Sequence, residues 1–180
     1  AISGGGVSPA ARVFESATTT TTLIAAGAAW KYLDDGSNQG SSWRGVSYND
    51  SAWQAGPAPL GYGDGDEATV VSYGPSASAK YITTYFRQEF QVADPKTFTS
   101  LLLKLVRDDG AVVFLNGQEM VRSNMPEGAI NNQTLAAGSV GGADESTFLS
   151  YNIPTSALRV GRNVIAVEVH QSSIDSSDIS

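Results

Sequence analysis

Residues 108–122 read Asp-Asp-Gly-Ala-Val-Val-Phe-Leu-Asn-Gly-Gln-Glu-Met-Val-Arg, and this stretch decides the fold class of the chain. Two extended runs, 111–115 and 118–122, flank the dipeptide Asn116-Gly117. Asn-Gly readily adopts the positive φ angles of the two-residue turn whose twist matches that of paired antiparallel strands. The stretch therefore predicts a β-hairpin.

Alternating apolar and polar residues predict further strands on both sides of the hairpin. One strand is expected over 81–92 and another over 163–170, each with apolar residues at every second position. Leucines on both faces of 98–106 predict a strand in the middle of its sheet. The run of β-branched threonines at 18–22 predicts the first strand.

No segment keeps helical periodicity over about eleven residues, and the one helical signal is a single turn at 154–158. The chain is therefore predicted to be all-β, a two-sheet antiparallel β-sandwich of the jelly-roll type. Residues 1–21 are expected to form a linker or N-terminal extension, and 22–180 a single β-sandwich module. Within that module, the glycine- and proline-rich segment 34–80 is expected to be mostly irregular.

The composition excludes several classes of function. Eighteen acidic side chains outnumber eleven Lys and Arg and give a net charge of −7, so phosphate-bearing nucleic acid is not expected as a partner. Cysteine is absent, which removes disulfides, thiolate metal sites and thiol nucleophiles. No apolar run reaches the roughly 18 residues that a membrane-spanning helix needs.

Catalytic machinery is also scarce in the sequence. His170 is the only histidine, and no Gly-x-Ser-x-Gly motif occurs, which disfavours both a Ser-His-Asp triad and zinc catalysis. We expect His170 to be a hydrogen-bonded residue at the end of its strand. Several acidic pairs are present, but a glycosidase needs two carboxyl groups facing each other across a cleft. The chain is therefore predicted not to be an enzyme.

The acidic, glycine-rich loop 61–67 is the main candidate metal site. Asp64, Asp66 and Glu67 supply three carboxylates in four residues, and Ca²⁺ takes about six to eight oxygen ligands. The loop 34–38 is a second candidate, and Asp144-Glu145 could complete either one. The alternative is an ordinary turn in which the carboxylates cap backbone N–H groups.

Aromatic residues near polar ones predict a carbohydrate-binding surface, because sugar rings stack on aromatic faces. Trp43, flanked by serines and an arginine, is expected to be the most exposed tryptophan, whereas Trp30 and Trp53 are expected to pack against the core. Arg107 is expected either to contact ligand or to form an internal ion pair with the aspartates that follow it. The predicted ligand-binding residues are Trp43, Arg44, Tyr62, Asp64, Arg107 and Asp108.

Several stretches of the sequence resemble known modules. Residues 108–117 and 161–170 resemble galactose-binding-like jelly-roll modules, which accompany glycoside hydrolases and other secreted bacterial enzymes. A closer likeness is to accessory modules of large secreted proteins that also carry metallophosphoesterase or lamin-tail domains, and it lies in residues 50–53, 58–64 and 84–87. Modules of this kind bind sugars, peptides or lipids, or have only a structural role.

The resemblance covers residues 28–178 and implies an extracellular module, secreted or at the cell surface, beside neighbouring domains of a longer chain. We expect a non-catalytic carbohydrate-binding or targeting module that binds a polysaccharide or other glycan and holds a loop-bound structural Ca²⁺. The alternative is a structural spacer or protein-interaction domain that positions a neighbouring enzyme and binds no sugar.

Overall fold

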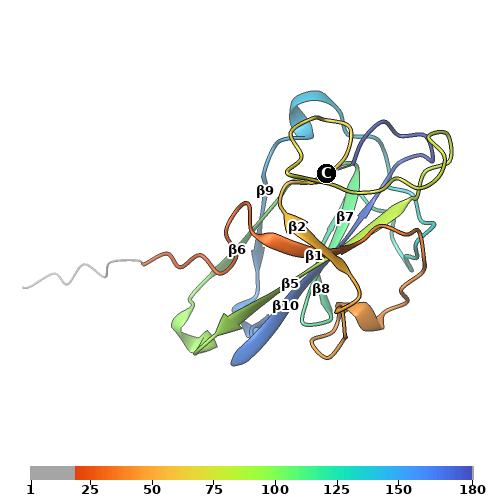
Figure 1. Ribbon diagram of the computed structural model, residues 1–180. Coiled ribbons are helices and arrows are strands. Elements are labelled where there is room, and N and C mark those ends of the chain that lie inside the picture. Colours follow the sequence, from red (N-terminus) through yellow and green to blue (C-terminus); the bar gives the residue numbers. More distant parts are fainter. Residues whose placement is uncertain (1–18, 180) are drawn as a thin grey trace, which may run out of the picture.

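A six-stranded antiparallel sheet is the main element of the computed structural model, which describes residues 19–179 (Figure 1). The strands follow the order β2-β1-β5-β10-β7-β8 across this sheet. Their bounds are Ala29–Leu33 for β1, Gln54–Pro57 for β2, Thr83–Val92 for β5, Gly110–Leu115 for β7, Gln118–Ser123 for β8 and Gly161–His170 for β10.

Two small sheets accompany the main one. Strand β3 (Leu60–Gly61) runs parallel to β4 (Thr69–Val70), and β6 (Leu101–Leu105) runs antiparallel to β9 (Leu149–Ile153). Four short 3-10 turns are the only helical segments in residues 19–179, which confirms the prediction of an all-β chain. One of them, η4 (Thr155–Ala157), lies where the sequence predicts a turn. No helix of the described chain is long and apolar enough to cross a membrane.

Strands β5 and β10 form the centre of the main sheet, where the sequence predicts two long strands. They pair along their full length, from Val92 opposite Gly161 to Thr83 opposite His170. Every residue of β10 from Asn163 onward is buried. Because both faces of the sheet are covered, apolar residues occupy both sides of this strand.

Successive residues of the central strands alternate between two apolar clusters, one on each face of the sheet. We call the first the strand-side core, because the leucines of β6 and Tyr151 of β9 pack against it. Its buried members are Tyr32, Leu60, Tyr62, Val71, Phe86, Val92, Ala111, Val113, Leu115, Val121, Ile153, Leu158, Ile165, Val167, Val169 and Ile179.

The second cluster, the loop-side core, is covered by irregular chain. Its buried members are Trp43, Trp53, Tyr85, Val112, Phe114, Met125, Ala136, Val164 and Ala166. Both tryptophans come from the segment between β1 and β2, which the sequence predicts to be irregular. The main sheet therefore has a strand layer on one side and a loop layer on the other.

A buried arginine fastens that loop layer to the sheet. Arg87, on β5, has no exposed surface. Its guanidinium donates to Asp50 Oδ2 at 2.8 Å and to the carbonyl oxygens of Gly45, at 3.2 Å, and of Trp43. The guanidinium carbon also lies 5.2 Å from the centre of the Tyr48 ring. These contacts hold residues 43–50 against the sheet.

The β7–β8 hairpin is confirmed, and its turn is tied to β10. Asn116 and Gly117 have φ angles of 55° and 88°. The Asn116 amide donates to Ala157 O and to Asn163 Oδ1, both at 2.8 Å, and its carbonyl oxygen accepts from the backbone N–H of Val164 at 3.0 Å. The side chain of the turn therefore satisfies polar groups of the β9–β10 connection.

Two predicted strands differ from the structure. Within the described residues 19–28 no strand forms, because the threonines have no neighbouring strand to pair with, and the first strand begins at Ala29. Residues 1–18, and with them most of the predicted linker, lie outside the described residues. Strand β6 is not central, because it pairs only with β9, and Leu102 on its outer side is 54% exposed.

Replacing Arg87 by Met should destabilise the fold by about 3 kcal/mol, because Asp50 and two backbone carbonyls lose their buried donor. Denaturant titration would measure this loss, and tryptophan emission should shift to longer wavelength as the loop layer loosens. Arg162→Met is the matched control: its pair with Glu89 and its 2.8 Å hydrogen bond to the carbonyl oxygen of Val46 are both exposed, so the change should stay within about 1 kcal/mol. Equal losses in the two variants would contradict the structural role of Arg87.

Replacing Gly117 by Ala should cost about 1–2 kcal/mol, because an L-residue is strained at the φ of 88° that the turn requires. Gly138→Ala is the control, since that glycine has no positive φ and open space around it. The control should be neutral or more stable by up to about 1 kcal/mol. Thermal unfolding of both variants would distinguish the two glycines.

Candidate functional site

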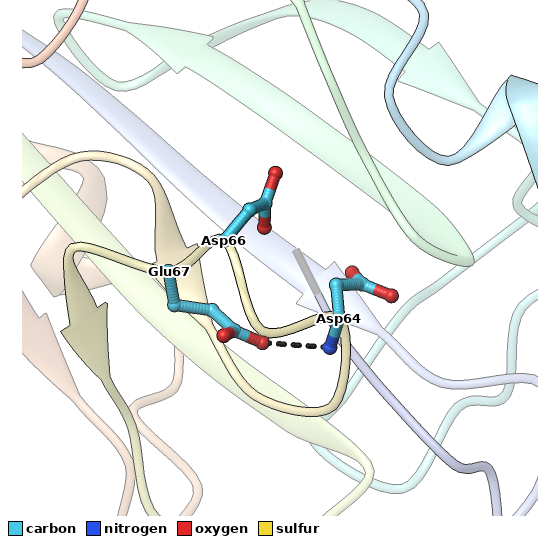
Figure 2. A group of neighbouring side chains, drawn as sticks. All are labelled: Asp64, Asp66 and Glu67. Atoms are coloured by element: carbon cyan, nitrogen blue, oxygen red, sulfur yellow. Dashed lines mark hydrogen bonds between the residues drawn. The ribbon is translucent and has the colours of Figure 1, made fainter.

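The predicted metal residues Asp64, Asp66 and Glu67 lie together in the loop between β3 and β4 (Figure 2). Each offers a carboxylate oxygen within 4.8 Å of the others. Glu67 accepts hydrogen bonds from the backbone N–H groups of Asp64 and Gly65, both at 2.9 Å. The hydrogen bond from its own backbone N–H lowers the pKa of Glu67 most, and the bonds from these two N–H groups lower it further. Desolvation acts in the opposite direction but does not outweigh them. Glu67 thus caps the turn, which was the alternative interpretation of this loop.

Asp64 also belongs to a second acidic group, which is assembled from distant parts of the chain. Its carboxylate points away from Glu67 in Figure 2 and lies within 4.8 Å of carboxylate oxygens of Glu145 and Asp178. Glu145 follows the 3-10 turn η3 (Gly142–Asp144), and Asp178 lies near the end of the chain. Desolvation, followed by the negative charges around it, raises the pKa of Asp64.

Local packing holds Asp178 beside this loop. Tyr62 and Ile179 exchange two backbone hydrogen bonds of 3.0 Å. A Cβ atom on Gly63 would lie 2.6 Å from Cβ of Asp178, so this close approach of the two segments requires glycine. The sequence analysis identified Asp144-Glu145 as a possible completing pair but missed Asp178, which lies more than a hundred residues from Asp64 and carries no local motif.

Asp108, predicted as a ligand residue, lies buried next to this group. It has no exposed surface, and neither of its carboxylate oxygens has a hydrogen-bond partner among the described residues. Burial, together with the negative charges of Asp109 and Asp178, raises the pKa of Asp108 to about 8. The adjacent Asp109 is satisfied, because it accepts from the backbone N–H groups of Val140 at 2.6 Å and Ser172 at 2.7 Å.

The prediction that Trp43 is exposed is wrong. The 3-10 turn η1 (Ser42–Arg44) directs the indole into the loop-side core, where none of its surface is exposed. Its ring centre lies 4.8 Å from that of Tyr85 and 5.9 Å from that of Phe114. The polar neighbours that suggested exposure lie on the outer side of the same turn. Trp43 therefore offers no stacking surface for a sugar.

The other two tryptophans behave as predicted. Trp53 is 6% exposed and lies in the loop-side core, and Trp30 packs against the strand-side core. Tyr62 is 7% exposed and belongs to the strand-side core. None of these rings forms an open aromatic platform.

Arg44 lines a small polar pocket on the loop side of the sheet. Its guanidinium lies 3.2 Å from Glu168 Oε1 and 4.1 Å from the ring centre of Phe114. The pocket has a volume of about 210 Å³, and charged side chains of β8 also line it, namely Glu119 and Arg122. It combines a few charged groups with one aromatic wall, as small-ligand sites do.

Arg107 forms no ion pair with the aspartates beside it in the described chain, in contrast to one of the two expectations. Its Nε donates instead to Ser123 Oγ at 3.0 Å. His170 is a hydrogen-bonded strand-end histidine, as expected, since its Nδ1 lies 3.0 Å from Thr83 Oγ1 and 2.7 Å from the carbonyl oxygen of Thr134. Its buried Nε2 has no hydrogen-bond partner in the described chain and lies 3.7 Å from Glu168 Oε2.

The six predicted ligand residues thus do not form one site. Trp43 and Arg44 belong to the loop side of the sheet, whereas Tyr62 packs in the strand-side core. Asp64 and Asp108 lie in the acidic region around Asp178. Two separate polar regions, the Arg44 pocket and the acidic region, are the candidate sites.

Solved structures with the same fold are found among glycosidases. A β-glucuronidase 2 of Bacteroides uniformis, covalently bound to cyclophellitol-6-carboxylate aziridine, matches with a TM-score of 0.53 and 18% identity over 80% of this chain. A β-glucuronidase from glycoside hydrolase family 2 matches with a TM-score of 0.52 and 18% identity over 86%. A calcium-binding mutant of the B. uniformis enzyme matches with a TM-score of 0.50 and 16% identity over 80%.

No protein-family model matches the sequence, and no curated protein matches it significantly. The likeness to the glucuronidases, at such low identity, shows a shared fold. The chain covers only 14% to 15% of the length of those enzymes, so the fold corresponds to one segment of each.

Proposed function

We propose that this chain is a non-catalytic accessory domain of a longer, secreted, glycosidase-like protein and positions a neighbouring domain. The observation that carries the proposal is the uneven coverage: at least 80% of this chain matches, but at most 15% of each enzyme does. Most of the length of each matched enzyme therefore lies outside the matched segment. The extracellular location and the single module over 22–180 are part of the same proposal.

The ionisable residues support this role, because several that a hydrolase would use are engaged in packing. His170 is held by Thr83 and Thr134, and Arg87 is held by the loop layer. Asp109 accepts two backbone hydrogen bonds. Groups fixed in this way stabilise the domain and are not free to transfer protons to a substrate.

We also infer a two-sheet sandwich of the jelly-roll type, as in galactose-binding-like modules. Strands β6 and β9 (Figure 1) pair antiparallel. Leu101, Leu103 and Leu105 of β6 and Tyr151 of β9 pack on the strand-side core. In this architecture the two strands form the second layer, which faces the main sheet.

A loop-bound calcium ion at Asp64, Asp66 and Glu67 belongs to the same proposal. The three carboxylates are close enough to share one cation. The description of one matched B. uniformis enzyme as a calcium-binding mutant adds support.

Glycan binding is the second candidate function, and the Arg44 pocket is the observation that favours it. A volume of about 210 Å³ suits a single sugar unit, and the guanidinium and carboxylate groups that line the pocket can bind sugar hydroxyls. Because the tryptophans are buried, recognition of a sugar at this pocket depends on hydrogen bonds and on contact with Phe114. Repetition of such a module along one chain would strengthen weak binding.

The accessory role predicts that the full chain does not hydrolyse glycosides. Incubation with a panel of 4-nitrophenyl glycosides, glucuronide included, should release nitrophenol no faster than buffer does. A rate above buffer that Asp64→Asn or Glu168→Gln abolishes would contradict the proposal, because it would place catalytic carboxyl groups in this domain.

Glycan binding at the Arg44 pocket predicts retardation of the protein in polysaccharide-containing gels. Glu119→Gln should weaken the retardation at least about fivefold, roughly 1 kcal/mol, because it removes one charge from the pocket wall and breaks the ion pair that orients Arg122, whose guanidinium binds both Glu119 carboxylate oxygens at 2.9 Å. Glu127→Gln is the matched control, since Glu127 is exposed on the following loop and does not line the pocket. Equal effects of the two variants, or no retardation by any polysaccharide, would contradict glycan binding at this pocket. Positioning of a neighbouring domain would then be the only function proposed.

A further inference from the structure

A buried carboxylate without a hydrogen-bond donor lies near one end of the main sheet. Asp108 lies two residues before β7, is fully buried, and has no partner for either carboxylate oxygen among the described residues. Two acidic groups act on it, the carboxyl groups of Asp109 and Asp178. When ionised, neither of them can donate a hydrogen bond to Asp108. A buried charge in this setting needs a compensating cation or a proton.

Three further carboxylates converge with one another, and one of them, Asp178, lies next to Asp108. Asp64, Glu145 and Asp178 each offer an oxygen within 4.8 Å of the other two. They come from the β3–β4 loop, the β8–β9 connection and the end of the chain, so tertiary packing alone brings them together. Asp178 is the link, because it belongs to this group and also lies next to Asp108.

A neutral oxygen is available on the same side of the domain. Gln171 is buried, and its amide nitrogen donates to the hydroxyl of Tyr62, while its Oε1 has no donor in the described chain. Burial raises the pKa of Tyr62 to about 12, and the negative charges of Asp178 and Asp108 act in the same direction. Carboxylates together with neutral oxygens are the ligands that Ca²⁺ prefers.

We propose that Asp64, Asp108, Glu145 and Asp178 bind one calcium ion. The donor set is composed of oxygen only and lies on loops, which suits Ca²⁺ better than Mg²⁺ or a transition metal. The ion neutralises the unpartnered Asp108 and fastens the end of the chain to the β3–β4 loop. This set shares Asp64 with the exposed group Asp64, Asp66 and Glu67, so the two groups are alternative sites for one ion, and the buried Asp108 favours this set. The inference replaces the exposed loop as the location of the ion, and it does not depend on the proposed accessory role.

Thermal unfolding of the full chain in EDTA and in CaCl₂ tests the proposal. At free Ca²⁺ about 100 times Kd, the midpoint should rise by roughly 5–10 °C. Asp108→Asn should abolish the rise, whereas Asp66→Asn, in the exposed group, should keep it. Asp108→Asn should fold at least as well as the native chain in EDTA, because an uncharged amide of the same shape replaces a buried carboxyl group that has no hydrogen-bond donor. Loss of the rise in this variant is then a loss of metal binding.

Calorimetric titration with CaCl₂ gives the second readout, with one ion bound per chain and at least about tenfold weaker binding in Asp108→Asn and Glu145→Gln. Amide hydrogen exchange over 171–179 should slow on addition of Ca²⁺. Three results would overturn the proposal: no heat and no shift in midpoint, an unchanged shift in Asp108→Asn, or a shift that only Asp66→Asn abolishes. The last result would place the ion in the exposed loop. None of these outcomes bears on glycan binding or hydrolysis.

Discussion

The Arg87 guanidinium, buried on the central strand β5, is the constraint on which the loop side of this domain depends. The loop carbonyls that it binds, and Asp50, belong to a segment with few regular hydrogen bonds of its own. Without the Arg87 guanidinium beneath it, that segment would lack the hydrogen bonds that hold it against the sheet. Once it does, Trp43 and Trp53 complete an apolar core that strands alone would leave open. An uncovered sheet face here would expose aromatic residues that promote association.

The same constraint shapes the functional interpretation. Aromatic side chains that pack under a loop cannot stack on a sugar, so binding of a glycan at this face depends on the polar Arg44 pocket. The described loops around Trp43 present no aromatic surface on which a sugar ring could stack. The proposed positioning role requires no such surface. The fold itself corresponds to a small segment of much longer glycosidases.

The acidic region has the opposite character. There, the chain gathers negative charge without supplying matching cations: Asp108 lacks a donor, and its neighbours are carboxylates. Asp109, one residue away, shows the alternative solution, since two backbone N–H groups satisfy it. The contrast between the two adjacent aspartates separates a carboxylate that backbone groups satisfy from one for which we propose a cation. A cation bound at this point would join the β8–β9 connection to the two segments that the Tyr62–Ile179 backbone bridge already holds together.

The sequence by itself determined the all-β class, the two long strands β5 and β10, and the Asn116-Gly117 hairpin, because alternation and turn chemistry act between near neighbours. It also identified Asp64, Asp108 and Arg44 as polar residues of interest. Only the tertiary structure decided that Trp43 is buried, that β6 is an edge strand, and that Asp178 and Glu145 meet Asp64. The burial of a side chain and the meeting of distant carboxylates depend on which parts of the chain pack together. The composition of the neighbouring sequence does not identify those parts. The serines and arginine beside Trp43 suggested an exposed side chain, but a buried guanidinium on β5 determined its position.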